Sequence, residues 1–283
     1  MWGETSRHLL QYWYALPVVA LGCTMTIMGG VGGNVVCGPF FILVLRLSPE
    51  AAIGTALVTE VFSMSSGVIG YWRRRLIDYK LGLTLGTAAA PRAIVGSLLS
   101  VHAPSVLLKI MFGIAIFLLA LLLFRSPREA DLERPAPFSE ADAPGSRRLV
   151  DALGRIYTYR VCQLPQLFMT SMVAGVGSGL VAIGGGEFNT PSMVMRCRIP
   201  LRVAAATSVF VMALTVLAGA STHVLIGRPV WNLVIWTVPG AIVGGQVGSY
   251  LASRLASALL KKWLSGLFVA VGTVMILNAV LFK

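Results

Sequence analysis

The chain has 283 residues, of which 56% are hydrophobic and 12% charged, and its mean hydropathy is +0.80. Soluble domains carry about 25% charged residues, so this composition excludes an ordinary soluble protein and indicates one embedded in a lipid bilayer. The formal net charge of +12 is interpreted as a signal of membrane orientation and not of nucleic-acid binding, because the basic residues fall mainly in loops on one predicted side.

Apolar segments are predicted in two sets of five along the chain. Those of the first half cover about residues 12–29, 35–46, 51–72, 81–100 and 105–124, and those of the second half cover about 164–182, 187–197, 203–224, 231–252 and 258–280. The second segment of each half reaches only about 18 Å at 1.5 Å per residue, which is too short for a hydrocarbon core of about 30 Å. Each half is therefore predicted to be a hairpin of short helices that enters and leaves on one face, followed by three transmembrane helices.

The two halves repeat each other at a constant offset of 152 positions, which pairs Pro39 with Pro191 and Thr55 with Thr207. Because a hairpin plus three spans crosses the membrane an odd number of times, the second half must be inverted relative to the first. The predicted fold is an all-α integral membrane protein of two inverted-topology repeats, residues 1–124 and 161–283, joined by a cytoplasmic linker at 125–160.

The distribution of lysine and arginine sets the predicted orientation. The loop at 73–80 holds four basic residues and the linker at 125–160 is rich in arginine, whereas the turn at 100–105 is nearly neutral. By the positive-inside rule, the loop and the linker are cytoplasmic, and the turn and both termini are external. Residues 131–146 are rich in proline, alanine and acidic residues, and we interpret them as a flexible tether.

Each hairpin is interrupted by a glycine-rich stretch, at residues 28–34 in the first half and 182–189 in the second. Glycine permits a sharp backbone break, and the short helices that follow present N–H groups and positive dipole ends at the middle of the membrane. We therefore predict that an anion binds between the two breaks. The candidate residues are Gly32, Gly33, Asn34, Cys37, Thr55, Gly184, Gly185, Gly186, Asn189, Thr207 and Ser208, with Gln246 as a further neutral hydrogen-bonding residue.

Three charged residues, Glu60, Arg92 and Glu187, lie within or beside apolar segments and are functional candidates by default. Glu60 and Arg92 are predicted at similar depths, about 12–14 Å at 1.5 Å per residue, so that they could form an ion pair. The residues leave open whether that pair is structural or whether one member handles a proton or the substrate. Glu187 stands beside the predicted anion site and must be protonated, paired or turned away, which makes it a candidate for proton coupling.

The repeated motifs resemble those of the sulfite exporter TauE/SafE family. They are Gly32-Gly33, Pro39 and Gly54-Thr55-Ala56 in the first half, matched by Gly184-Gly185-Gly186, Pro191 and Ala206-Thr207-Ser208 in the second. The resemblance covers nearly the whole chain except the linker at 125–160, and Asn34 departs from it where a third glycine is usual. It implies a multi-pass protein of the bacterial inner membrane that transports, and as its name suggests exports, a small sulfur-containing anion such as sulfite or an organosulfonate.

Other functional classes fit the sequence less well. A membrane thiol-redox electron carrier would need paired cysteines near both breaks, but Cys23, Cys37, Cys162 and Cys197 show no CxxC or metal-ligand spacing and are interpreted as free thiols. An enzyme is not expected, because no hydrolase, metalloprotease or nucleotide-binding motif is found. A transporter of a different small organic anion stays an alternative. No cofactor, metal or nucleic acid is expected; the expected partners are the anion, the lipid bilayer and a coupling proton, and homo-oligomerisation is left open.

Overall fold

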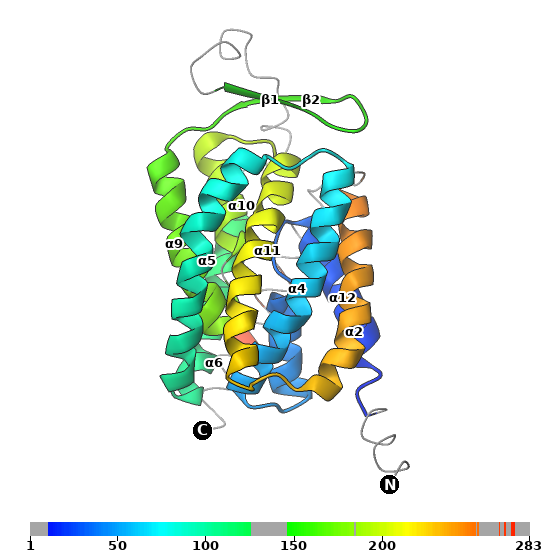
Figure 1. Cartoon of the computed structure of the whole chain (residues 1–283), viewed down its shortest axis with the longest axis vertical. Helices are drawn as coiled ribbons and strands as arrows, with labels where there is room; N and C mark the ends of the chain where they lie inside the picture. The colour runs from blue at the N-terminus through cyan, green and yellow to red at the C-terminus, as the bar shows by residue number, and fades with distance from the viewer. Residues whose placement is uncertain are drawn as a thin grey trace.

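The computed structural model describes residues 11–125, 146–183 and 185–252, with a few isolated positions beyond residue 252. The described part is a bundle of helices covered at one end by a two-stranded sheet (Figure 1). The elements of the first half are α2 (Ala15–Met28), α3 (Asn34–Pro39), the π-helical turn η1 (Phe40–Val44), α4 (Pro49–Arg73), α5 (Tyr79–His102) and α6 (Ser105–Arg125). They are followed by β1 (Ser146–Val150), β2 (Ile156–Arg160), α9 (Leu164–Val181), α10 (Gly186–Cys197), α11 (Leu201–Leu225) and α12 (Trp231–Ala252).

The predicted apolar segments that fall on described residues are helical, with ends that shift by a few residues. The helix starts have local causes. Ser48 accepts a hydrogen bond from the Ala51 N–H ahead of α4, and Asp78 accepts one from the Leu81 N–H ahead of α5, so each fills the N-cap role. The segment predicted at 258–280 lies outside the described residues apart from isolated positions.

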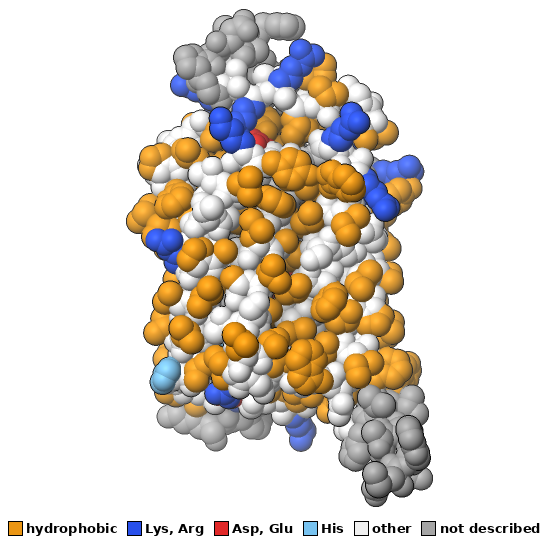
Figure 2. Space-filling view, in the orientation of Figure 1, with side chains coloured by type: hydrophobic (Ala, Val, Ile, Leu, Met, Phe, Trp, Pro, Cys, Tyr) orange, Lys and Arg blue, Asp and Glu red, His pale blue; other side chains and the backbone are white. Residues whose placement is uncertain are grey.

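The surface of the bundle is apolar where a soluble protein would be polar. Large side chains such as Leu99, Val173 and Leu217 are exposed, whereas Thr59 and Thr237 are buried and hydrogen-bond each other at 2.7 Å. Hydrophobic side chains spread over the sides of the bundle (Figure 2). By length and composition, four described helices can cross a membrane: α4, α5, α9 and α11. The chain is thus a mostly helical integral membrane protein, as the composition predicts.

The two halves are intertwined, because the first helix of each packs against a later helix of the other. Helix α2 packs along α12, and α9 packs along α5. Glycines allow this close approach: a Cβ at Gly248 would crowd the Thr24 carbonyl oxygen, and one at Gly96 would collide with the Val176 carbonyl oxygen. Gly96 and Gly248 are 152 positions apart, and so are Thr24 and Val176.

A second contact recurs at the same spacing. The Thr55 hydroxyl accepts a hydrogen bond from the Val230 N–H at 2.9 Å, and the Thr207 hydroxyl accepts one from the Asp78 N–H at 3.0 Å. Val230 and Asp78 each precede the first turn of a long helix, α12 and α5 respectively. The loop before α5 lies at the end of the bundle that carries the sheet, and the loop before α12 lies at the other end (Figure 1).

Residues 146–160, which the sequence analysis places in the linker, form an antiparallel hairpin in which Ser146 pairs with Arg160 and Val150 with Ile156. Asp151 closes its turn by accepting hydrogen bonds from Leu153 and from the backbone and side chain of Arg155. Burial alone would raise the pKa of Asp151, but these hydrogen bonds outweigh it and hold the pKa below its ordinary value. The predicted tether at 131–146 lies almost wholly outside the described residues.

Candidate functional site

The two glycine breaks meet inside the bundle. Helix α2 ends at Met28 with Gly29 as its C-cap, and Gly30 takes the positive φ of 68° that turns the chain back. The Gly30 carbonyl accepts a hydrogen bond from the Thr190 hydroxyl of α10 at 2.9 Å, and the Gly32 N–H donates one to the Glu187 carboxyl of α10 at 3.0 Å. The first turns of α10 therefore contact the break of the other half directly.

The structure brings only some of the predicted site residues together. Gly32, Asn34, Gly185, Gly186 and Ser208 lie at or beside the meeting point: Ser208 donates a hydrogen bond to the Gly186 carbonyl at 3.2 Å. Gly33 and Cys37 are also buried at the first break. Gly184 lies outside the described residues.

Other predicted site residues have hydrogen-bonding roles elsewhere. The hydroxyls of Thr55 and Thr207 accept from the loops before α12 and α5, as described above. The Asn189 side chain donates to the Ser171 hydroxyl of α9 at 3.3 Å, and Gln246 donates to the Ser66 carbonyl at 2.8 Å. These contacts fix neighbouring helices relative to one another.

The ion pair expected between Glu60 and Arg92 is not formed, and that expectation is wrong. Glu60 is buried and accepts a hydrogen bond from the Asn34 side-chain amide, whereas Arg92 is half-buried on α5. Helix α5 packs mainly against α9 and α11, and α4 packs mainly against α12 and α11. Helices α4 and α5 are consecutive in sequence but are thus not closest neighbours in the bundle. Similar depth in the membrane therefore does not bring Glu60 and Arg92 together.

The carboxyl group that faces Glu60 is instead Glu187. A Cβ added to Gly32 would collide with Oε1 of Glu60 and would lie 2.6 Å from Oε1 of Glu187. The two carboxyl groups, one from each half, therefore approach the same point of the first break. Both residues are candidates from the sequence, but no sequence signal places them together.

The cysteines differ from the expectation of four free thiols. Cys23 and Cys37 are free and buried beside the first break. Cys162 and Cys197 form a disulfide that joins the chain after β2 to the last residue of α10, with their Cα atoms 5.3 Å apart. The spacing of 35 residues carries no motif, so only the fold reveals that the two meet.

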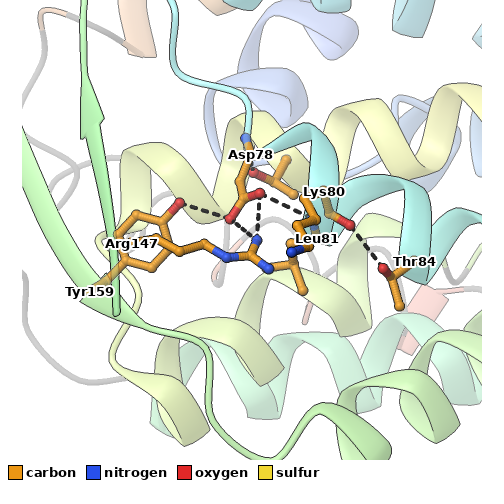
Figure 3. Close-up of polar contacts among 7 residues, drawn as sticks. Asp78, Lys80, Leu81, Thr84, Arg147 and Tyr159 are labelled. Atoms are coloured by element: carbon orange, nitrogen blue, oxygen red, sulfur yellow. Dashed lines mark hydrogen bonds and ion pairs between the residues drawn. The ribbon is translucent and has the colours of Figure 1, made fainter. Parts of the chain in front are cut away.

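Asp78, which the sequence analysis did not single out, links three parts of the molecule (Figure 3). Its carboxyl accepts from the Arg147 guanidinium at 2.6 Å and from the Tyr159 hydroxyl at 2.9 Å, both on the hairpin, while it also caps α5. Burial, followed by the nearby Asp78 charge, raises the pKa of Tyr159 well above its ordinary value. An aspartate just before a predicted helix is a sequence signal for a cap, but its partners on the hairpin, 69 and 81 positions away, leave no such signal.

Comparison with known proteins identifies the family. The model of the sulfite exporter TauE/SafE family matches residues 15–275. The chain is 30% identical over 248 residues to the probable membrane transporter protein YunE of Bacillus subtilis (strain 168), a match that covers 84% of this chain and 88% of that protein. It is 24% identical over 248 residues to a probable membrane transporter protein of Xylella fastidiosa (strain Temecula1 / ATCC 700964), covering 84% of this chain and 83% of that protein. No solved structure matches the chain. The resemblance inferred from the glycine, proline and threonine motifs is therefore confirmed: the chain belongs to the sulfite exporter TauE/SafE family and is a membrane transporter.

Proposed function

We propose that the protein is a secondary transporter that binds a small sulfur-containing anion, such as sulfite or an organosulfonate, between the two glycine breaks. The observation that carries this proposal is the direct contact between the breaks, made by Thr190 with Gly30 and by Glu187 with Gly32. The first turn of α10 offers backbone N–H groups and a positive dipole end to an anion, and Asn34 and Ser208 add neutral hydrogen-bonding groups nearby. The name of the family supports the choice of sulfite.

We further propose that the two halves are inverted repeats that exchange access between the two sides of the membrane. The recurring contacts support this: Thr55 with Val230 at one end and Thr207 with Asp78 at the other occupy equivalent positions of the two halves. A two-fold axis in the membrane plane would relate such contacts. Rocking of one half against the other would then open the breaks first to one side and then to the other.

The end that carries the β1–β2 hairpin is proposed to face the cytoplasm. Basic side chains gather at that end of the molecule (Figure 2), where the loop after α4 and the hairpin hold Arg73, Arg74, Arg75, Arg147 and Arg148. The positive-inside rule assigns such an end to the cytoplasm. With the odd number of crossings in each half, both termini would be external, in a bacterial inner membrane, with export as the working direction.

The thiol-redox alternative gains no support from the positions of the cysteines. Cys23 and Cys37 lie beside the first break, but the Cys162–Cys197 disulfide lies at the far end of α10 from the second break. Electron transfer through cysteine pairs at both breaks would need a pair at each. A different small organic anion stays an alternative substrate. An uptake assay that compares sulfite with a small organic acid separates the two.

The test uses purified full-length protein in proteoliposomes, with uptake of sulfite measured against thiosulfate, sulfate, a sulfonate and a small organic acid. The decisive variant is Gly32→Ala, because its methyl group would collide with both carboxyl groups. Such overpacking typically costs about 1–3 kcal/mol, which would weaken anion binding about 5- to 150-fold if the whole cost fell on the bound state. Sulfite uptake should therefore fall to near background.

The matched control is Gly219→Ala on α11. A Cβ there meets its nearest neighbour, the Ser97 hydroxyl, at 3.4 Å, which is an ordinary contact. This variant should keep uptake within about twofold of the unmodified protein, because a surface or uncrowded change is usually within about 0.5 kcal/mol. If Gly32→Ala transports sulfite as well as Gly219→Ala does, the anion does not bind at the breaks.

A further inference from the structure

Two carboxyl groups are enclosed where the breaks meet. Glu60 of α4 is 2% exposed and Glu187 of α10 is 1% exposed. Both direct an Oε1 atom at the space over the Gly32 Cα, so that a single methyl group placed there would crowd both atoms. One carboxyl group comes from each half of the molecule.

The hydrogen bonding of Glu60 is incomplete. Its Oε2 accepts from the Asn34 side chain, but its Oε1 has no hydrogen-bond partner among the residues that the structure describes. Glu187 Oε1, in contrast, accepts from the Gly32 N–H at 3.0 Å. A buried polar atom is nearly always satisfied, and an unsatisfied one indicates a ligand, water or ion that completes the site.

The surroundings of Glu60 indicate what that ligand is. The groups that face its carboxyl are Glu187 from α10, the thiols of Cys23 on α2 and Cys37 on α3, and the neutral backbone of 33–34, while α11 presents the uncharged Met212. None of these described groups is a cation. A carboxylate in a low-dielectric interior costs several kcal/mol unless it is compensated, and two carboxyl groups that share a site do not both ionise readily. A proton on one of the two carboxyl groups would reduce this cost.

We propose that Glu60 and Glu187 form one proton-binding site, in which a proton bound between the two carboxyl groups makes the site acceptable to an anion. The proton converts one carboxylate to a carboxylic acid, so that the two groups carry one negative charge in place of two, and the new O–H is a donor directed at the space between them. When that proton leaves, the second negative charge returns and increases the repulsion of the anion. The proton site itself does not depend on the proposed function. The coupling of proton and anion, in which both are released on the same side of the membrane, rests on it.

The first experiment needs no substrate. Infrared difference spectroscopy of the full-length protein in lipid, in H2O and D2O, detects the C=O stretch of protonated carboxyl groups. At neutral pH a deuterium-sensitive band should be present, and it should disappear in Glu60→Gln combined with Glu187→Gln. Glu50→Gln is the control, because Glu50 lies at the start of α4 and bonds Ser105 at 2.6 Å, away from the breaks. Absence of the band from the unmodified protein at neutral pH would overturn the proposal.

The second experiment measures coupling, with internal pH and sulfite followed together in proteoliposomes. The unmodified protein and Glu50→Gln should move protons with sulfite, and a pH gradient should accelerate uptake. Glu187→Gln should lose this acceleration by a pH gradient. Acceleration by a sodium gradient in place of a pH gradient would assign the site to a metal cation and overturn the proposal. If sulfite is not transported but the infrared band behaves as expected, the proposed function fails and the proton site stands.

Discussion

The two halves of the molecule bring different chemistry to equivalent positions of the central site. Met212 occupies the position equivalent to Glu60, and Gly186 occupies the position equivalent to Asn34, each pair 152 residues apart. In the first half the Asn34 amide bonds the Glu60 carboxyl, and in the second half the Met212 sulfur lies against Gly186. The repeat thus preserves which positions touch, while a polar contact in one half is replaced by an apolar contact in the other.

The two ends of the bundle likewise share a backbone contact but differ in a side chain. Asp78 and Val230 are equivalent, and both backbone N–H groups donate to a threonine hydroxyl. Only Asp78 has a side chain that can bind Arg147 and Tyr159 of the hairpin. A single difference in residue type therefore attaches the β1–β2 hairpin to one end of the bundle and gives the two ends different properties.

The largest effect should come from making the first half resemble the second. Glu60→Met should abolish acceleration of sulfite uptake by a pH gradient and should lower stability, because the buried Asn34 amide loses its acceptor, at about 1–3 kcal/mol. Adding Asn34→Gly removes that unsatisfied amide and should recover part of the stability without restoring coupling. Uptake and thermal unfolding in detergent measure the two effects. Retained coupling in Glu60→Met would show that the polar contact of the first half is dispensable.

The next effect concerns stability and should follow from making Asp78 resemble Val230. Asp78→Val removes the cap of α5, at about 1 kcal/mol, and leaves Arg147 and Tyr159 without their acceptor, for a total of about 2–3 kcal/mol. Asp78→Asn keeps an oxygen for the cap and should lose about 1 kcal/mol. Trypsin should cleave the hairpin at Arg147 or Arg148 faster in Asp78→Val than in Asp78→Asn. Equal cleavage of the two variants would mean that the carboxyl does not hold the hairpin.

Features that depend on neighbouring or periodic residues were predictable from the sequence, and features that depend on distant residues were not. Helix positions and the family were predictable because hydrophobic length, caps and the repeat of Pro39 and Thr55 are local or periodic signals. The approach of Glu60 and Glu187 to the same point over Gly32 was not predictable, because it depends on which helices become neighbours, and that is decided by packing over the whole bundle. The β1–β2 hairpin was missed although Ile156 to Arg160 alternates in the manner of a strand and Gly154 follows Asp151 in a turn pattern.

The hydrogen bonds from the loop N–H groups to Thr55 and Thr207 should contribute equally to stability at the two ends of the bundle, at about 1 kcal/mol each. Thr55→Val and Thr207→Val each remove the acceptor of one loop N–H, and each should lower stability by that amount. The control is Thr84→Val, because the exposed Thr84 hydroxyl bonds only the Lys80 carbonyl of its own helix. Thermal unfolding should shift by a similar amount for Thr55→Val and Thr207→Val and hardly at all for the control. A loss at one end alone would break the equivalence.

The smallest effect concerns the turn that distinguishes the hairpin end. The pKa of Asp151 is below its ordinary value of 3.8 in the folded protein because hydrogen bonds from Arg155 and Leu153 outweigh burial. A carboxyl group with a lowered pKa stabilises the fold above its unfolded pKa, and that contribution is lost as the pH falls through the folded pKa. Amide protection of the hairpin in hydrogen exchange, compared with Asp151→Asn at each pH, should therefore exceed that of the variant at neutral pH and approach it as the pH falls through the lowered pKa of Asp151. Arg155 is partly exposed and surface ion pairs contribute little. The effect should therefore be small and confined to the hairpin, and the amide protection of α4 and α11 should not change. A difference between protein and variant that persists unchanged at low pH would show that the charge of Asp151 does not stabilise the turn.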